Sequence, residues 1–433
     1  MTVSRTLRVG VIGFGWMGRL HARSWARLSA HYPGLPLRPA LVAVGDSNQS
    51  EELSRSVEAH GFAELHADWR DLLARDDLDV VSVCGPNHLH RDMAVAVVES
   101  GRHLWIEKPA GRNAEETAEI ATAVEKAGVQ SAAGFNYRNA PAIEYARQLV
   151  RDESLGRLQT VEVRFLADYA AHPEGALSWR FLNEQAGSGV SGDLASHAVD
   201  LAYYVAGDVV ALVADDGRFI TDRPLSAGSG SHFARGVQGT LGAVENEDYV
   251  GALLRFAGGA RGTLVAGRTA VGEQCGYGIA VHGDRGAFAW DFRRMGELRV
   301  SIGADYQDAS YETVLANRTH GEYSAFQPGG GIAMGYDDLK VIEAYRLAQS
   351  IAASAPVGAT VKDALRAAEL VDAMQLSISQ HSWVATWRPG RTGGRASQPP
   401  STTRWVGVHG RAASPSFAGL SIQGDKASSR VRR

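Results

Sequence analysis

The sequence predicts an α/β protein in which a doubly wound parallel domain precedes an α+β domain with an open, mostly antiparallel sheet. In residues 1–136 continuous apolar runs alternate with amphipathic stretches, the pattern of strands buried between helices. After Gly156 apolar and polar residues alternate with period two, and glycine turns separate the runs. We therefore expect domains at 1–136 and 137–387, and a tail at 388–433.

Each expected helix of the first domain has a boundary signal. Gly61, Gly101 and Gly128 follow amphipathic stretches, and glycine is common just past a helix end. The expected strands are 7–15, 41–48, 79–87, 103–109 and 129–135, and the helices between them are 16–30, 49–60, 89–100 and 114–127.

The second domain begins with an alternating strand at 157–168. Segments 248–270 and 278–292 each predict two strands around a glycine-containing turn. Residues 226–242 are rich in Gly and Ser, so we expect a surface loop there. Two helices, at 336–353 and 361–380, complete the domain.

Composition excludes several classes of protein. The 433 residues include no apolar run of about 18, so we expect no membrane span. There is no secretory signal pattern at the N-terminus, and the two cysteines are far apart, which favours the cytosol and argues against a disulfide framework. Residues 388–433 hold nine Lys or Arg and one Asp, a charge of +8, so the rest carries −12 and is a poor nucleic-acid binder. A basic tail can bind anions, but we expect this one to be solvated and disordered.

A glycine motif between the first strand and the first helix predicts a phosphate site. Gly13, Gly15 and Gly18 give GxGxxG, with Trp16 and Met17 in the variable positions. This spacing allows a tight turn, a close approach to a pyrophosphate and close helix packing, and the helix N-terminus binds the anion. The context predicts a Rossmann dinucleotide-binding domain, with an ordinary glycine turn as the alternative.

Asp46 ends the second strand, where a carboxylate accepts the hydroxyls of an adenine ribose and repels a 2′-phosphate. Ser47 follows, and no arginine is adjacent, so we expect NAD as the cofactor rather than NADP. A plain turn residue is the alternative for Asp46.

Two later strands end in polar residues at the edge where such sheets bind ligands. Glu107 and Lys108 precede a proline, which stiffens the backbone, and we expect both to contact the cofactor. Lys108 can also stabilise a developing negative charge. A solvated lysine is the alternative. At the neighbouring strand end we expect Pro86, Asn87 and His90 to approach the nicotinamide end of the cofactor.

The segment after Gly187 predicts a helix with one unusual polar stripe. Asp193, His197 and Asp200 share a face at positions i, i+4 and i+7, among apolar residues. The stripe is consistent with a catalytic cleft. The alternative is a satisfied core histidine beside an aspartate that caps the helix.

These motifs together resemble the Gfo/Idh/MocA oxidoreductases. The glycine loop, Asp46, PNHLH at 86–90, EKP at 107–109 and GSGxxGDxxxHxxD at 187–200 match in order and spacing from about residue 7 to 387. SWRF at 178–181, AGSG at 186–189 and GFNYR at 134–138 look most like the levoglucosan-dehydrogenase type of sugar dehydrogenase. Ser188 departs from a glycine often found there, and Gly192 allows a looser helix start.

The resemblance implies a reaction and a set of site residues. It implies that Lys108, Asp193 and His197 form a catalytic triad, and that the bond before Pro109 is cis. It also implies an outer sheet face that forms a homodimer or homotetramer interface. In this scheme His197 is the base, Lys108 fixes the substrate oxygen and relays a proton, and Asp193 orients substrate or histidine. Asp200 either supports the catalytic residues from behind or serves as a buried structural partner, and we favour the structural role.

Polar and aromatic residues at cleft positions suit a sugar, anhydrosugar, glycoside or cyclitol, although each could equally serve packing. Besides the triad, the candidate substrate residues are Tyr137, Arg138, Trp179, Arg180 and Tyr336. We expect no metal, because strand and turn geometry scatters His88, His90 and His103, and hydride transfer needs none.

Two other functions are consistent with the same scaffold. A non-catalytic sensor of NAD or sugar is one, and the presence of all three triad residues argues against it. A dehydrogenase of inositol, a dihydrodiol or an imine is the other, and the sequence excludes it only weakly.

Overall fold

The computed structural model describes residues 5–225, 236, 239–303 and 305–386. Contacts divide the chain after Thr392, and all of these residues lie in the first unit. The predicted tail at 388–433 lies outside the described residues, as does most of the loop predicted at 226–242. The last part of that loop is instead strand β10, Leu241–Ala243, which pairs with β9, Asp222–Pro224.

The first domain is a Rossmann fold. Its six strands are all parallel and lie in the order β3-β2-β1-β4-β5-β6, the order of dinucleotide-binding sheets. The strands are β1 Arg5–Ile12, β2 Leu37–Gly45, β3 Glu64–His66, β4 Val80–Val83, β5 His103–Ile106 and β6 Ser131–Ala133.

The main helices of this domain lie where the sequence predicts them. They are α1 Trp16–His31, α2 Glu51–Ala59, α4 Asn87–Glu99 and α5 Ala114–Ala127. Asn113 caps α5 through the amide of Glu116, and Gly128 ends it with a positive φ of 67°. The short β3 and α3, Trp69–Leu73, were not predicted, because three and five residues are too few to show a period.

The second domain is built on a nine-stranded sheet in the order β16-β15-β14-β13-β7-β12-β11-β8-β17. All of its neighbours are antiparallel except β7 and β12, and both predicted hairpins are confirmed as β11–β12 and β13–β14. The strands are β7 Leu158–Leu166, β8 Val209–Gly217, β11 Tyr249–Phe256, β12 Arg261–Gly267, β13 Gly276–Gly283, β14 Gly286–Asp291, β15 Glu297–Ile302, β16 Glu312–Leu315 and β17 Val384–Ala385.

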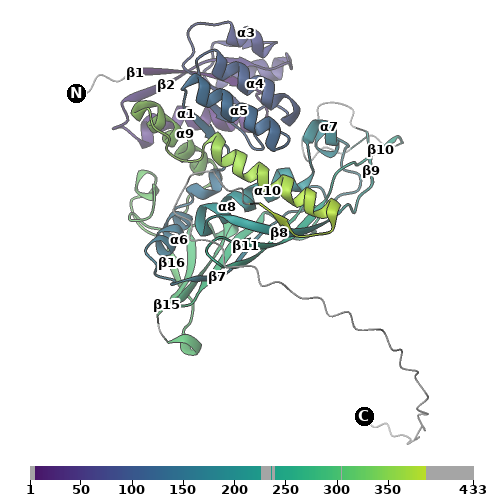
Figure 1. Ribbon diagram of the computed structural model, residues 1–433. Helices are drawn as coiled ribbons and strands as arrows, with labels where there is room; N and C mark the ends of the chain where they lie inside the picture. The colour runs from purple at the N-terminus through teal and green to yellow at the C-terminus, as the bar shows by residue number, and fades with distance from the viewer. Residues whose placement is uncertain (1–4, 226–235, 237–238, 304, 387–433) are drawn as a thin grey trace, which may run out of the picture. The chain divides into compact units, whose positions relative to one another are not determined.

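Helices cover one face of the large sheet. Helix α8, Ser196–Ala206, packs on β7, and α10, Val361–Gln380, packs on β8 while also contacting α5 of the Rossmann domain (Figure 1). Helix α6, Pro141–Arg151, packs beside α8. The inner face is therefore buried, whereas Glu162 and Arg164 of β7 point to the opposite, exposed face.

Helix α9, Tyr336–Ala353, belongs in space to the Rossmann domain. It lies beside α1, and its apolar residues Val341, Ala344 and Leu347 share a core with β1 (Figure 1). The predicted boundary at residue 136 is therefore not a boundary between two separately packed bodies. The C-terminal part of the chain supplies a covering helix to the first sheet.

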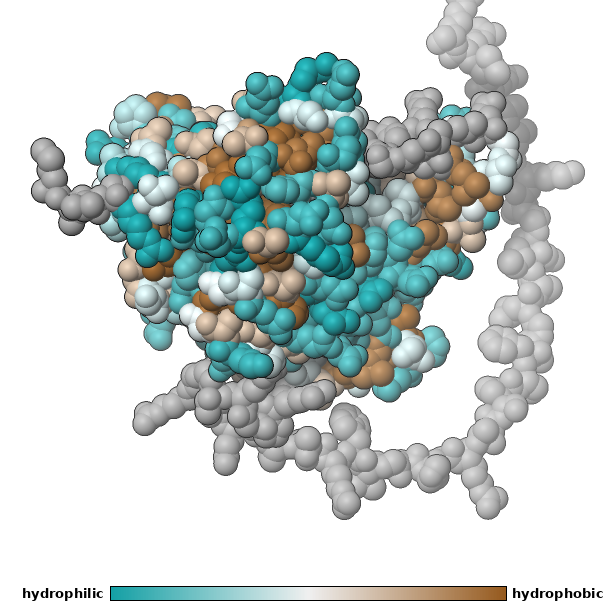
Figure 2. Space-filling model, turned by 90° about the horizontal axis from the view of Figure 1, so that it is seen from above, coloured by the Kyte–Doolittle hydropathy of each residue, from teal (hydrophilic) through white to brown (hydrophobic). Residues whose placement is uncertain are grey.

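No helix in the described parts of the chain combines the length and the apolar character that a membrane crossing needs. In the view from the Rossmann side, hydrophobic residues form small separate groups among hydrophilic ones (Figure 2).

Candidate active site

The glycine loop has the geometry that a pyrophosphate site needs. Gly13 has a φ of +83°, and a Cβ on Gly18 would lie 2.0 Å from the carbonyl oxygen of Gly13, so both must be glycine. A Cβ on Gly15 would meet nothing within 4 Å, which leaves open space above the start of α1. The free amide groups of that helix end face the open space and can bind phosphate.

Asp46 follows β2 beside this loop. Its carboxylate accepts hydrogen bonds from the amides of Phe14 at 2.7 Å and Asn48 at 2.9 Å. The side chain is only partly buried, and Ser47 next to it is exposed. Asp46 thus holds the glycine loop and retains lone pairs for a ribose, so its two suggested roles are compatible.

Lys108 and Asp193 meet between the two domains. The Nζ of Lys108 lies 2.6 Å from Oδ1 of Asp193 and 2.8 Å from its carbonyl oxygen. Lys108 follows β5, and its bond to Pro109 is cis. The hydroxyl of Tyr169 donates to Oδ2 of Asp193 at 2.5 Å, and burial raises the pKa of that hydroxyl, which keeps its proton in place.

His197 lies at the same place, on α8, within an aromatic cage. Its ring contacts Tyr137 edge to face with centroids 4.8 Å apart, and its carbonyl accepts from Tyr277 at 2.8 Å. Burial lowers the pKa of His197 well below its usual value, and the charge of Lys108 lowers it further. The imidazole is therefore neutral near pH 7, which is the form that accepts a proton.

The predicted helix begins with a π turn, Ser191–Ala195, before α8. Asp193 lies inside this turn, and its carboxylate bonds to Lys108 and Tyr169 rather than capping the helix. Turns of this kind are frequent at functional sites, because the wider spacing re-aims one side chain. The alternative that Asp193 is only a helix cap is thus wrong.

Arg138 has its guanidinium occupied by two carboxylates, which favours a structural role over the predicted substrate contact. It is 5% exposed and forms a two-pronged ion pair with Asp200, with a further contact of 3.3 Å to Asp363. The pair ties η1, Asn136–Asn139, to α8 and α10. The structural role favoured for Asp200 is confirmed by the same contacts.

Glu107 is buried, and its carboxylate is occupied by partners from two helices, which favours a structural role over the predicted cofactor contact. It accepts from Lys340 of α9, and its Oε1 lies 2.9 Å from the Nε2 of His21. The α-carbon of Gly134 packs closely against it, since a Cβ there would lie 2.6 Å from the Glu107 carboxylate. The carboxylate is used to hold β5 and α9 together.

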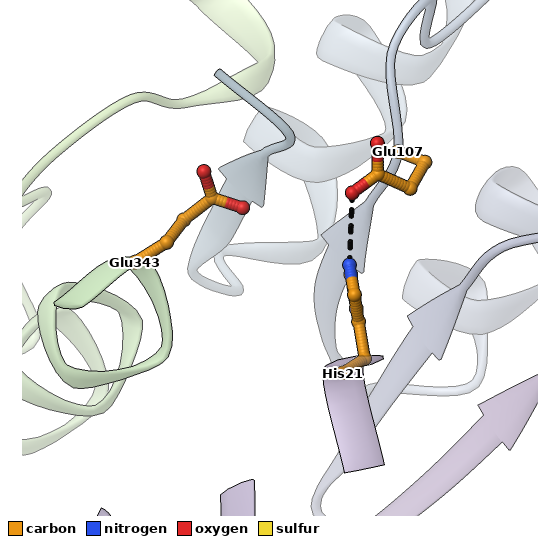
Figure 3. Close-up of side chains that lie close together, drawn as sticks. All are labelled: His21, Glu107 and Glu343. Carbon is orange, nitrogen blue, oxygen red and sulfur yellow. Dashed lines mark hydrogen bonds and ion pairs between the residues drawn. The ribbon is translucent and has the colours of Figure 1, made fainter. Parts of the chain in front are cut away.

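Glu343 completes this buried cluster (Figure 3). His21 and Glu107 point toward each other, and the carboxylate of Glu343 turns toward the same space. These three side chains lie close enough to share a metal ion, but the ammonium of Lys340 already occupies the space by donating to both carboxylates. Burial lowers the pKa of His21 to about 4 and raises that of Glu343 to about 7. The cluster is therefore a buried ion network and not a cation site.

Pro86, Asn87 and His90, which follow β4, have different surroundings. His90 is 1% exposed, and its ring nitrogens face the carbonyls of Pro109 and Gly85, each at 2.8 Å. These contacts favour a role in positioning the backbone over the predicted contact with the cofactor. Pro86 precedes α4, and Asn87 donates to the carbonyl of Ala186 across the domain junction at 3.1 Å.

An aromatic series connects the glycine loop to His197. Trp16, 62% exposed, stacks on Tyr336 with centroids 5.8 Å apart, and Tyr336 meets Tyr137, which meets His197. Met17 next to Trp16 is partly buried. Of the predicted substrate residues, Tyr137 thus lies beside His197, and Tyr336 lies between Tyr137 and the glycine loop.

Arg180 presents a cation near Asp193. Its guanidinium lies 4.3 Å from the ring of Trp179, and within the described residues it forms no ion pair with a carboxylate. Burial lowers its pKa, and Asp193 opposes that effect. A partly buried cation without a bonded carboxylate can bind the oxygens of a polar ligand.

Sequence reasoning missed Tyr169. It lies three residues after β7, and nothing in the one-dimensional pattern shows that the end of β7 lies against the π turn. An aromatic residue just past a strand end was the only signal.

Comparison with known proteins adds to this geometry. The family described as "Oxidoreductase family, NAD-binding Rossmann fold" matches residues 7–135, and the "GFO/IDH/MocA C-terminal domain" matches residues 143–289. Levoglucosan dehydrogenase of Pseudarthrobacter phenanthrenivorans is 32% identical over 88% of this chain and 98% of that protein. D-glucoside 3-dehydrogenase of Escherichia coli is 30% identical over 47% of this chain and 55% of that protein. A solved levoglucosan dehydrogenase complex with NADH and levoglucosan has a TM-score of 0.82 at 31% identity, covering 89% of this chain and 100% of that one.

The assignment of Arg138 to structure predicts a stability effect. Arg138→Met leaves the buried Asp200 without its main partner, and breaking such a pair costs about 3–5 kcal/mol. Urea denaturation should show that loss in the free energy of unfolding. The control Arg157→Met removes an exposed pair at 3.9 Å and should cost less than about 1 kcal/mol. A stable Arg138→Met protein with a raised KM would instead return Arg138 to the substrate site.

The environment of His197 predicts a pH dependence. Because burial and Lys108 lower its pKa, the base stays neutral as the pH falls through about 6.5, the ordinary histidine value. The acid limb of kcat/KM for alcohol oxidation should therefore have its midpoint below that value. Steady-state rates across a pH series measure it, and an acid limb centred above 6.5 would contradict the assignment.

Proposed function

The chain belongs to the Gfo/Idh/MocA oxidoreductases, whose first domain is an NAD-binding Rossmann fold, and we propose that it oxidises a secondary hydroxyl of a sugar, anhydrosugar, glycoside or cyclitol. It is an NAD-dependent dehydrogenase acting on CH–OH groups. The observation that carries the proposal is the Lys108–Asp193 contact beside the neutral His197, at the edge of the sheet that holds the glycine loop.

The site residues fit NAD. The open space above Gly15 and the helix end accommodate a pyrophosphate, and Asp46 lies where a ribose hydroxyl is recognised. Bound there, NAD would supply a hydride acceptor at the nicotinamide. The complex of a relative with NADH supports the same choice.

The side chains divide the remaining chemistry. Lys108 donates a hydrogen bond to the substrate oxygen and stabilises the negative charge that develops as the O–H bond breaks. His197 takes the hydroxyl proton while the C–H bond gives its electron pair and hydrogen to the cofactor, leaving a ketone. Asp193 holds the Lys108 ammonium and is itself held by Tyr169.

A polyhydroxylated ring fits the rest of the cleft. Trp179, Tyr137 and Tyr336 offer aromatic surface for the apolar face of a ring, and Arg180 offers donors for hydroxyl oxygens. The names of the relatives, which act on levoglucosan and on a D-glucoside, support this class of substrate.

We also infer that a second copy of the chain covers the outer face of the large sheet, in a homodimer or homotetramer. That face bears a broad hollow of about 780 Å³ lined by Val265, Ala280, Leu315 and neighbouring charged residues, and no helix of the described chain packs on it. Light scattering measures the number of copies in the assembly, and a monomer would contradict this inference.

We also propose a cytosolic location. Cys84 and Cys275 are unpaired, which supports it.

Turnover and its dependence on two side chains test the reaction. Wild type, with NAD and a panel of levoglucosan, glucose, glucosides and inositols, should produce NADH, measured by its absorbance. His197→Ala and Lys108→Ala should each lower kcat by about 10²–10⁴-fold, because each removes a group that acts on the reacting oxygen. Tight NAD binding by calorimetry without any turnover would instead favour a sensor.

The cofactor choice depends on charge at Asp46. Asp46→Asn keeps an acceptor for the amide of Phe14 but removes the charge that would repel a 2′-phosphate. The ratio of kcat/KM for NAD to that for NADP should fall about tenfold, which corresponds to about 1.4 kcal/mol. Asp68→Asn, a change at the cap of α3, is the control and should leave the ratio unchanged.

A further inference from the structure

Three consecutive polar residues before β11 are buried against the candidate site. Asn246, Glu247 and Asp248 are 3%, 7% and 0% exposed. Buried polar groups must find partners, and these three residues find theirs on several elements of the fold. Together they make a polar anchor for the substrate side of the cleft.

Glu247 bonds to the backbone that leads into the catalytic turn. Its two carboxylate oxygens accept from the amide of Gly189 at 3.0 and 3.1 Å, and Oε1 also accepts from the amide of Ser191 at 2.9 Å. The carbonyl of Glu247 accepts from the amide of Val190 at 3.0 Å. Three successive amides, those of Gly189, Val190 and Ser191, are thus satisfied by one residue that is 56 or more positions away in sequence.

This contact fixes the place of Asp193. Ser191 is the first residue of the π turn, and the amide of Asp193 bonds to the carbonyl of Gly189 at 3.2 Å. All three residues that Glu247 holds therefore lie within about one turn of Asp193. The fit leaves no slack, because a Cβ on Gly189 would lie 2.2 Å from the carbonyl oxygen of Glu247.

Asn246 and Asp248, on either side of Glu247, hold the segment that carries Arg180. The side-chain amide of Asn246 donates to the carbonyl of Arg180 at 2.9 Å. Arg268 donates to Asn246 at 2.8 Å and to Asp248 at 2.8 Å, and Asp248 also accepts from the amide of Phe219. The same short segment thus locates both Arg180 and the turn that carries Asp193.

We propose that Glu247 is a positioning residue for the hydride-transfer reaction, acting through Asp193 to set the geometry of Lys108. The inference rests on the proposed function. Lys108 bonds to the carbonyl as well as the carboxylate of Asp193, so a displaced turn moves both of its partners. A misplacement of about 1 Å at such a site costs about 10²-fold in rate.

The first test is a double-mutant cycle with Asp193→Asn. Glu247→Ala should lower kcat by about 10²-fold, with an unchanged dissociation constant for NAD. Glu247→Gln, which keeps one acceptor for both amides, should recover most of that loss. In the Asp193→Asn background, Glu247→Ala should cost little more, because the residue through which it acts is already altered. Equal losses in both backgrounds would overturn the proposal.

The second test does not require turnover. Hydrogen exchange followed by mass spectrometry should show faster exchange at residues 187–193 in Glu247→Ala than in wild type. Asp68→Ala is the matched control, because it removes a carboxylate that caps α3 through the amide of Arg70 at 2.8 Å. It should leave both exchange at 187–193 and kcat unchanged. Unchanged exchange in Glu247→Ala would overturn the positioning role of Glu247, even if no substrate is found. Faster exchange without any turnover in wild type would count only against the proposed function.

Discussion

The contact between Lys108 and Asp193 joins the carboxyl end of β5 to the π turn of the second domain, and the other site residues are arranged around it. A single ion pair between partly exposed groups is weak by itself. Here the geometry of the pair is set by the contacts that restrict each of its two residues. On one side Pro109 and the buried Glu107 restrict the backbone of Lys108, and on the other Glu247 and Tyr169 restrict Asp193.

The Rossmann side of this contact depends on a helix from the far end of the chain. Lys340 of α9 places an ammonium group between Glu107 and Glu343, and the indole of Trp105 donates to Glu343 at 2.6 Å. Two carboxylates in an apolar core would be very costly without this cation. The second domain therefore completes the electrostatics of the first, which explains why α9 packs there rather than on its own sheet.

Much of this arrangement was readable from the sequence. The Rossmann order, the hairpins and the glycine loop follow from periodicity and turn residues, which act over a few positions. Lys108, Asp193 and His197 can be proposed as site residues because each lies in a local motif. The buried ion pairs of Arg138 and Glu107 could not be predicted, because a motif does not reveal which way a side chain points. Their partners, Asp200 and Lys340, are 62 and 233 residues away.

The residues that sequence reasoning missed share one property. Tyr169, Glu247 and Lys340 each act on a motif residue from a different part of the chain, and none lies in a pattern of its own. A reacting group is recognisable because its chemistry restricts its type and spacing. A group that only holds it can come from any element that the fold brings near. The motifs therefore predict the reaction, whereas the precision of the site is set by contacts that only the folded chain brings together.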